Sequence, residues 1–72
     1  MNKRALRSVM ALNGDTCKTL AEFLQIARNT FSAKLNQTHG AEFTQNEIAA
    51  IKNRYNLTPG QVDSIFFGQK PS

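Results

Sequence analysis

The sequence predicts an all-α fold, a compact bundle of five short helices in one domain over residues 1–72. Three observations predict it: the length of 72 residues suits one small domain, apolar residues recur at the spacing of amphipathic helices, and residues typical of helix starts and stops separate the apolar runs. Only the ends, Met1 with Asn2 and residues 69–72, are expected to fray. The helices are expected over residues 3–12, 17–25, 28–36, 45–55 and 59–67.

The first segment has the pattern of an amphipathic helix. Leu6, Val9 and Met10 fall on one side of it, and its basic residues fall largely off that side. The next two residues, Asn13 and Gly14, tolerate a positive φ. They therefore predict the end of this helix.

Two short helices are expected in the stretch that follows. Thr16 can cap the first of them. The apolar phase then resets after Ile26 and Ala27, where Phe31 and Leu35 begin a new pair at i and i+4, although no glycine or proline intervenes. This reset predicts two helices at a sharp angle rather than one long helix. The apolar residues expected on one side of the first are Leu20, Ala21, Leu24 and, at the edge, Phe23.

A loop over residues 37–43 separates these helices from a fourth helix with a well-marked start. Residues 44–47, Thr-Gln-Asn-Glu, form a capping box, and Phe43 and Ile48 stand at the two positions of a hydrophobic staple. Asn56 predicts the end of this helix. The apolar face that we expect it to bury consists of Ile48, Ile51 and Tyr55.

The fifth helix repeats the same kind of start at residues 58–61, with a capping threonine, Pro59 at the first helical position and a glutamine at the third. Gly68 predicts its end. Phe66 and Phe67 are adjacent, so one faces the core, and the other is either peripheral packing or an exposed anchor for a partner. The residues expected to face inward are Val62, Ile65 and Phe66.

The charge of the chain is uneven. Nine Lys and Arg residues against five Asp and Glu residues give a net charge of +4, and residues 1–34 hold six of the basic residues but only two of the acidic ones. A localised basic surface favours nucleic acid or an acidic protein patch over a small neutral ligand. No apolar run approaches the roughly 18 residues of a membrane span and no signal peptide precedes the domain, so we expect a cytoplasmic protein without membrane contact.

Catalytic and metal sites are not expected. Cys17 and His39 are the only candidates for a nucleophile and a base, and one such pair in 72 residues is a weak signal for catalysis. A single cysteine excludes an internal disulfide, and one cysteine with one histidine disfavours a metal site. The sequence therefore indicates a protein that is not an enzyme and has no cofactor and no small-molecule substrate.

The stretch over residues 17–35, CKTLAEFLQIARNTFSAKL, resembles the helix-turn-helix of the Cro and lambda-repressor-like family of phage and bacterial regulators. That family domain has five helices, so the resemblance covers nearly the whole chain. The chain departs from the family pattern at Gln25, where a turn glycine is usual, at Ala27, where a capping Ser or Thr is common, and at Cys17, often a glutamine. The matching residues have the family's small or apolar character: Ala21, Ile26, Phe31 and Leu35.

This resemblance implies that the helix over residues 28–36 enters the major groove of DNA with its first residues at the base edges. In that docking Arg28 would bind guanine, Asn29 adenine and Ala33 a thymine methyl group. Phosphate contacts would come from Lys18, Thr19 and Lys34. The residues expected to contact DNA or a partner lie on the third, second and first helices: Arg28, Asn29, Ser32, Ala33, Lys34, Asn36, Lys18, Thr19, Arg4 and Arg7.

A second resemblance involves the whole chain and especially residues 55–58 (YNLT) and 61–67 (QVDSIFF). It is similar to short early proteins of temperate phages of Gram-positive bacteria, and most of all to the modulator-of-repression (antirepressor) proteins of lactococcal phages. The resemblance implies a regulator of the lytic–lysogenic switch in the cytoplasm of the bacterial host. Such a protein binds the lysogenic repressor and blocks its operator binding.

The alternative is a Cro-like, sequence-specific repressor that binds operator DNA as a dimer. A single small module usually reads a groove weakly, so this alternative needs a dimer, and the sequence shows no dedicated dimerisation segment beyond the last helix. At most a weak homodimer is expected. The two hypotheses share one fold and differ in whether the lysogenic repressor, operator DNA or both are the partners.

Overall fold

The helices begin and end close to the residues that mark them in the sequence. The computed structural model describes residues 1–67, and all regular structure in this part of the chain is helical, without a strand. The prediction of an all-α fold of five helices is thereby confirmed. Gly68, the expected end of the last helix, lies outside the described residues. The elements in chain order are α1 (Lys3–Leu12), α2 (Cys17–Leu24), α3 (Arg28–Asn36), the 3₁₀ turn η1 (Thr38–Gly40), α4 (Gln45–Tyr55), α5 (Pro59–Val62) and η2 (Asp63–Phe67).

Threonines start three of the helices through reciprocal hydrogen bonds. Before α4, the Glu47 backbone N–H donates to Thr44 Oγ1 at 3.2 Å, and the Thr44 N–H donates to Glu47 Oε1 at 2.8 Å. The same pair of bonds forms across residues 58–61 before α5. Both boxes confirm the sequence prediction. Thr16, expected only as a cap, forms a third box with Thr19 before α2.

The N-terminus and the last helix differ from the prediction. The Asn2 N–H donates to the Ile65 carbonyl at 2.7 Å, and the Asn2 side chain accepts from the Ala5 N–H. Asn2 therefore caps α1 and holds it against the last helix instead of fraying. That bond depends on tertiary packing, which apolar periodicity does not encode. Within the expected helix 59–67, α5 is only the first turn, and residues 63–67 wind as one wider π turn, η2.

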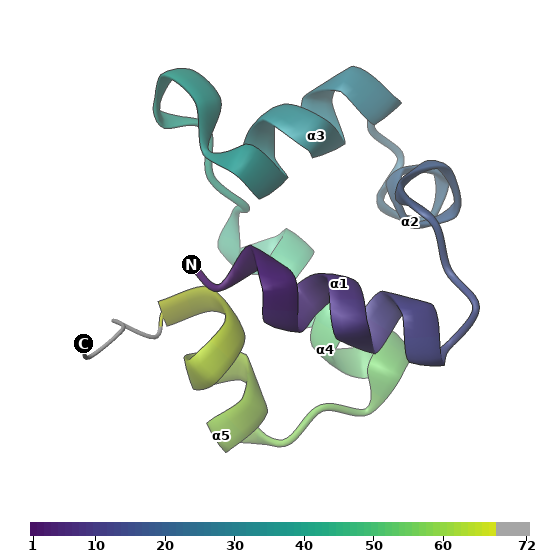
Figure 1. The fold of residues 1–72 in the computed structure, drawn as a ribbon, viewed down its shortest axis with the longest axis vertical. Coiled ribbons are helices and arrows are strands. Elements are labelled where there is room, and N and C mark those ends of the chain that lie inside the picture. Colours follow the sequence, from purple (N-terminus) through teal and green to yellow (C-terminus); the bar gives the residue numbers. More distant parts are fainter. Residues whose placement is uncertain (68–72) are drawn as a thin grey trace.

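The turn between α2 and α3 depends on a glutamine in a conformation that favours glycine. α2 ends at Leu24, one residue before the predicted end, and Gln25 has φ 62° and ψ 40°. The Ile26 N–H donates to the Ala21 carbonyl at 3.0 Å, which closes the helix end. Ala27 begins α3 without a side-chain cap, as predicted. The two helices consequently cross steeply, with α2 seen nearly end-on in Figure 1 while α3 lies across the view.

Every α-helix, and η2, contributes side chains to the core. Phe43, in the loop before α4, joins two of them, because its ring meets Phe31 of α3 edge to face at 5.6 Å and Phe66 of η2 at 5.9 Å between centroids. Val9, Leu24 and Tyr55, expected on inner faces, pack only half-buried at the edge of the core. Each of the first four α-helices places one completely buried side chain at the centre: Leu6, Leu20, Phe31 and Ile51.

The helices enclose this core from several sides. In Figure 1, α1 crosses in front of α4, α2 and α3 lie at the top and right, and α5 lies at the lower left. The N-terminus lies close to the end of the last helix. The molecule measures 31 × 28 × 20 Å along its principal axes. Over residues 1–67, no helix has the length and apolar character needed to span a bilayer.

Candidate binding surface on α1 and α3

The exposed side of α3 carries most of the residues expected to contact a partner. Arg28, Ser32 and Asn36 follow one another at intervals of four residues and form a stripe of exposed polar side chains. Asn29 is exposed beside this stripe, and Ala33 is half-buried at its edge. The structure therefore brings five of the expected residues onto one side of a single helix.

The first turn of α3 lies open beside a shallow hollow. Because Ala27 provides no side-chain cap, the first backbone N–H groups of α3 are available to a carbonyl, a carboxylate or a phosphate. The hollow has a volume of about 400 Å³ and lies between α2 and α3. Lys18 and Arg28, both expected contact residues, line it together. Glu22, which the sequence analysis did not single out, lines it as well.

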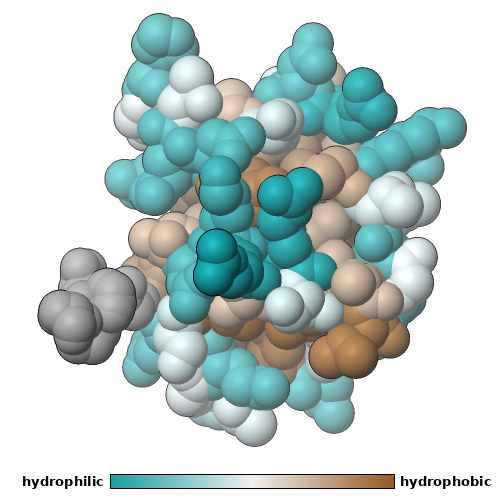
Figure 2. All heavy atoms as spheres, in the orientation of Figure 1, coloured by the Kyte–Doolittle hydropathy of each residue, from teal (hydrophilic) through white to brown (hydrophobic). Residues whose placement is uncertain are grey.

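The basic start of α1 adjoins the end of this stripe. Lys3 Nζ donates to Asn36 Oδ1 at 2.7 Å, and Asn36 Nδ2 donates to the Ser32 carbonyl at 3.0 Å. Arg4 and Arg7 are exposed and form no ion pair with any residue from 1 to 67. Figure 2 shows strongly hydrophilic side chains gathered over the front of the molecule, where α1 lies.

We call this combined region the α1–α3 surface. The sequence offers Lys3 beside Arg4 and Arg7 as a phosphate or partner contact, but its bond to Asn36 joins residues 33 positions apart and leaves no local signal. Its residues are polar or basic and exposed: Lys3, Arg4, Arg7, Arg28, Asn29, Ser32 and Asn36.

Lys34, expected to contact phosphate, is paired within the protein. Its Nζ donates to both carboxylate oxygens of Glu47 at 2.7 Å, and both side chains are largely shielded from solvent. Burial alone would raise the pKa of Glu47, but the hydrogen bonds from Lys34 and the Thr44 N–H outweigh it, and the pKa lies below its ordinary value. Lys34 thus fastens α3 to the start of α4.

A second ion pair stands at the start of α2. Asp15 Oδ2 accepts from Arg54 Nε at 2.8 Å and from the Tyr55 hydroxyl at 2.6 Å, while Oδ1 accepts from Arg54 Nη2 at 2.8 Å and from the Thr19 hydroxyl at 2.9 Å. The Arg54 guanidinium also lies over the Phe23 ring, 4.5 Å from its centroid. We call these five residues the Asp15 cluster. It joins the turn before α2 to the end of α4.

The Asp15 cluster engages polar groups beside two expected phosphate contacts, and Arg54 neutralises its carboxylate. Hydrogen bonds from Arg54 hold the pKa of Asp15 well below its usual range, against the opposing effect of burial, and bonds from Tyr55 and Thr19 add to them. Burial and the nearby carboxylate raise the pKa of Tyr55, so its hydroxyl stays protonated at neutral pH. Of the two expected phosphate contacts, Thr19 already donates its hydroxyl to Asp15. Only the exposed Lys18 keeps its polar group outside the cluster.

The candidates for catalysis and metal binding lie in separate elements. Cys17 is half-buried at the first residue of α2, and His39 is exposed in η1. In the described part of the chain, no three Asp, Glu, His or Cys side chains gather closely enough to hold a metal ion.

Comparison with known proteins adds nothing to this geometry. No family model, no curated protein and no solved structure matches the chain. The α1–α3 surface and the Asp15 cluster are therefore the features that bear on function.

Proposed function

We propose that this chain regulates the lytic–lysogenic switch of a temperate phage as an antirepressor, a binding protein rather than an enzyme. It binds the lysogenic repressor through the α1–α3 surface and blocks the repressor's operator binding. The fold it uses is a helix-turn-helix domain of the Cro and lambda-repressor type. Support for that fold comes from the steep crossing of α2 and α3, the tight turn at Gln25 and the small Ala21, 1% exposed, where the two helices meet.

One observation carries the choice of a protein partner over DNA: polar groups at the start of α2 are already engaged within the Asp15 cluster. In helix-turn-helix docking, the start of this helix faces a DNA phosphate, which gains from the helix dipole and the free N–H groups. Here a carboxylate with a lowered pKa is already bonded to Thr19 at that end. The Thr19 hydroxyl and the Arg54 guanidinium are both engaged by Asp15 and are therefore not free to hold a phosphate at this position.

The ion pair between Lys34 and Glu47 also favours a protein partner over DNA. Affinity for DNA rises with the number of phosphates that Lys and Arg neutralise, and the charge of Lys34 is already neutralised by Glu47. The exposed polar stripe of Arg28, Ser32 and Asn36 is equally suited to carbonyls and carboxylates on a protein. Binding the repressor by this stripe does not require Lys34 or Thr19 to contact a phosphate.

The second candidate is the Cro-like operator reader. The specific observation in its favour is that Arg28 and Asn29 are exposed at the uncapped first turn of α3, where base-reading residues stand in helix-turn-helix proteins. This candidate requires a dimer on a near-palindromic site.

Two binding measurements with the same variants separate the candidates. Under the proposal, the chain co-elutes with the lysogenic repressor of its phage and releases labelled operator DNA from it, and the double variant R28A/N29A weakens this by about tenfold or more. The variant R4A/R7A tests the α1 part of the surface. Lys52→Ala, which removes a positive charge from α4 outside the α1–α3 surface, is the matched control and should leave the effect unchanged.

Fluorescence anisotropy with operator DNA alone tests the second candidate. An operator reader prefers its promoter over a scrambled duplex by about a thousandfold, with a steep salt dependence. That result, combined with no co-elution with the repressor, would overturn the antirepressor proposal. Repressor binding that persists in both double variants would remove the α1–α3 surface from the interface.

A further inference from the structure

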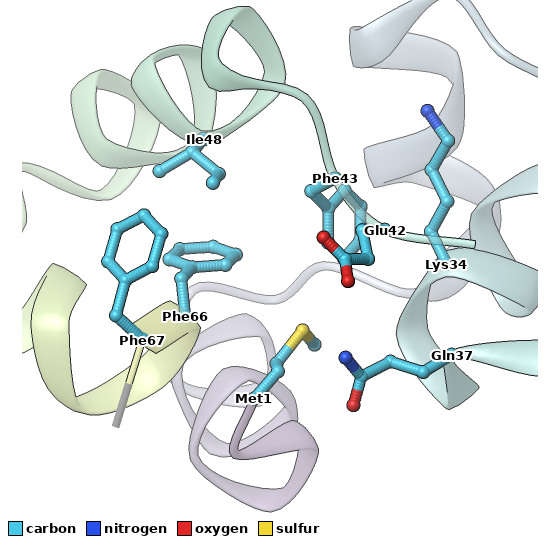
Figure 3. Close-up of a pocket in the computed structure, with 8 residues that line it drawn as sticks. All are labelled: Met1, Lys34, Gln37, Glu42, Phe43, Ile48, Phe66 and Phe67. Atoms are coloured by element: carbon cyan, nitrogen blue, oxygen red, sulfur yellow. The ribbon is translucent and has the colours of Figure 1, made fainter. Parts of the chain in front are cut away.

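A pocket with aromatic walls lies where the N-terminus, the end of α3 and η2 meet. It has a volume of about 270 Å³. Phe66 and Phe67 stand on one side and Phe43 on the other, with Met1 below them (Figure 3). Phe67, expected to be either peripheral packing or an anchor, is 50% exposed here, so part of its ring is free to meet a ligand.

The pocket has an acidic group, Glu42. Glu42 lines it, and Figure 3 shows the Glu42 carboxylate turned into the pocket beside the Phe43 ring. Within residues 1–67, Glu42 forms no ion pair. Lys34 also lines the pocket, but its ammonium is directed away from it and is paired with Glu47. The Gln37 amide adds a polar group to the same rim.

Elsewhere in the chain, an arginine binds a carboxylate and an aromatic ring at the same time. In the Asp15 cluster, the Arg54 guanidinium lies 4.5 Å over the Phe23 ring and bonds to both oxygens of Asp15. The pocket offers the same two groups, a phenyl ring and a carboxylate. A guanidinium matches them better than an ammonium, because it binds a carboxylate with two parallel bonds, stacks on rings and is more weakly hydrated.

We propose that this pocket binds the side chain of an arginine presented by a partner protein, with an ion pair to Glu42 and cation–π stacking on Phe67. The identity of the partner as the lysogenic repressor rests on the proposed function, whereas the ligand chemistry of the pocket does not. The pocket thus forms a second contact region of opposite charge to the α1–α3 surface. It would let a protein that presents an arginine meet the chain at two places.

The first test uses a small probe and needs no repressor. The tripeptide acetyl-Gly-Arg-Gly-amide is titrated into the full chain and followed by NMR, with the tripeptide carrying citrulline, the neutral isostere of arginine, as the matched ligand. The arginine probe should shift the signals of Glu42, Phe43 and Phe67, and the citrulline probe should not. Equal shifts with both probes, or no shifts at the pocket, would overturn the proposal.

Three variants test the named groups. Glu42→Gln should weaken the arginine probe about fivefold, because it removes the charge of a solvent-accessible pair. Phe67→Leu keeps an apolar side chain but removes the ring, and should weaken the probe as well. Glu22→Gln makes the same charge change on α2 and should leave the affinity unchanged. Undiminished binding to Glu42→Gln, in a chain whose spectrum shows it folded, would overturn the assignment.

The second test connects the pocket to the partner. If the arginine belongs to the repressor, Glu42→Gln also weakens co-elution with the repressor, while Glu22→Gln does not. A pocket that binds the arginine probe, together with co-elution that Glu42→Gln leaves intact, would overturn the repressor as its partner and keep the pocket. Loss of co-elution in R28A/N29A alone bears on the proposed function and not on the pocket, so the two failures are distinguishable.

Discussion

Replacing Asp15 by asparagine tests whether the Asp15 cluster holds α2 against α4. Asparagine keeps the shape of the side chain and one acceptor oxygen but removes the charge. The hydroxyls of Tyr55 and Thr19 lose their charged acceptor, and each such bond contributes about 1 kcal/mol net. The Arg54 ion pair adds little, because the Arg54 guanidinium is open to solvent that screens it. We therefore expect a loss of about 2 kcal/mol in the free energy of unfolding at neutral pH.

That loss is large for a chain of this size. A domain this small has a net stability of only about 3–5 kcal/mol. With a urea m value of about 1 kcal/mol per molar, the unfolding midpoint should move about 2 M lower, which far-UV circular dichroism measures. Asp63→Asn is the matched control, because Asp63 is exposed and forms no ion pair within residues 1–67, and it should change the stability by less than about 0.5 kcal/mol.

The pH dependence identifies the charge as the cause. The pKa of Asp15 in the folded chain lies below its unfolded value of about 3.8, so its contribution is fully present above that value and is lost as the pH falls further. Glu47, whose pKa is also lowered, acts equally in both proteins and cancels in the difference. The stability gap between the wild type and Asp15→Asn should therefore narrow below about pH 4. A gap that stays constant down to about pH 3, or a midpoint shift no larger than that of Asp63→Asn, would refute the reasoning.

Three further substitutions test the turn, the helix crossing and the cap. Gln25→Gly relieves the positive φ of 62° and should stabilise the chain by about 1 kcal/mol, measured as a melting temperature about 4–8 °C higher; an unchanged temperature would contradict this. Ala21→Leu forces α2 and α3 apart and should lower the free energy of unfolding in urea by about 2 kcal/mol. The control Ala33→Leu, at the half-buried edge of α3, should lower it much less, and equal losses would argue against a close crossing at Ala21. Thr44→Ala removes the acceptor of the Glu47 N–H and should lower the free energy of unfolding by about 1 kcal/mol. The control Thr38→Ala in η1 should change it little, and similar losses for the two variants would show that the cap is unimportant.

The helix boundaries were predictable because their signals are local. Atoms within four residues along the chain decide three of these features: the capping box at Thr44, the left-handed conformation of Asn56 at the end of α4 and the missing side-chain cap at Ala27. The steep crossing of α2 and α3 was predictable from the shift in apolar phase. The π turn at residues 63–67 was not, because the same apolar spacing suits an ordinary helix there.

The candidate site was likewise predictable only where its signals are local. Periodicity alone puts Arg28 and Asn29 on an exposed side, but it cannot say which charged residues find partners across the fold. Asp15 and Arg54 are 39 residues apart in the sequence, and Lys34 and Glu47 are 13 apart. These pairings decide which cations remain for a partner, so the choice between DNA and protein depends on contacts that only the folded chain reveals.

The charges that remain unpaired favour a protein partner for a reason independent of any one contact. The α1–α3 surface has Arg4, Arg7 and Arg28 without ion pairs among residues 1–67, and the aromatic pocket has Glu42 in the same condition. A DNA duplex presents negative charge alone along its backbone, so it can satisfy the arginines but is repelled by Glu42. A protein presents both signs of charge and can satisfy both regions at once, and charge complementarity of this kind gives specificity as well as a faster encounter. The distribution of unpaired charge therefore argues for recognition of a folded regulator in preference to recognition of an operator.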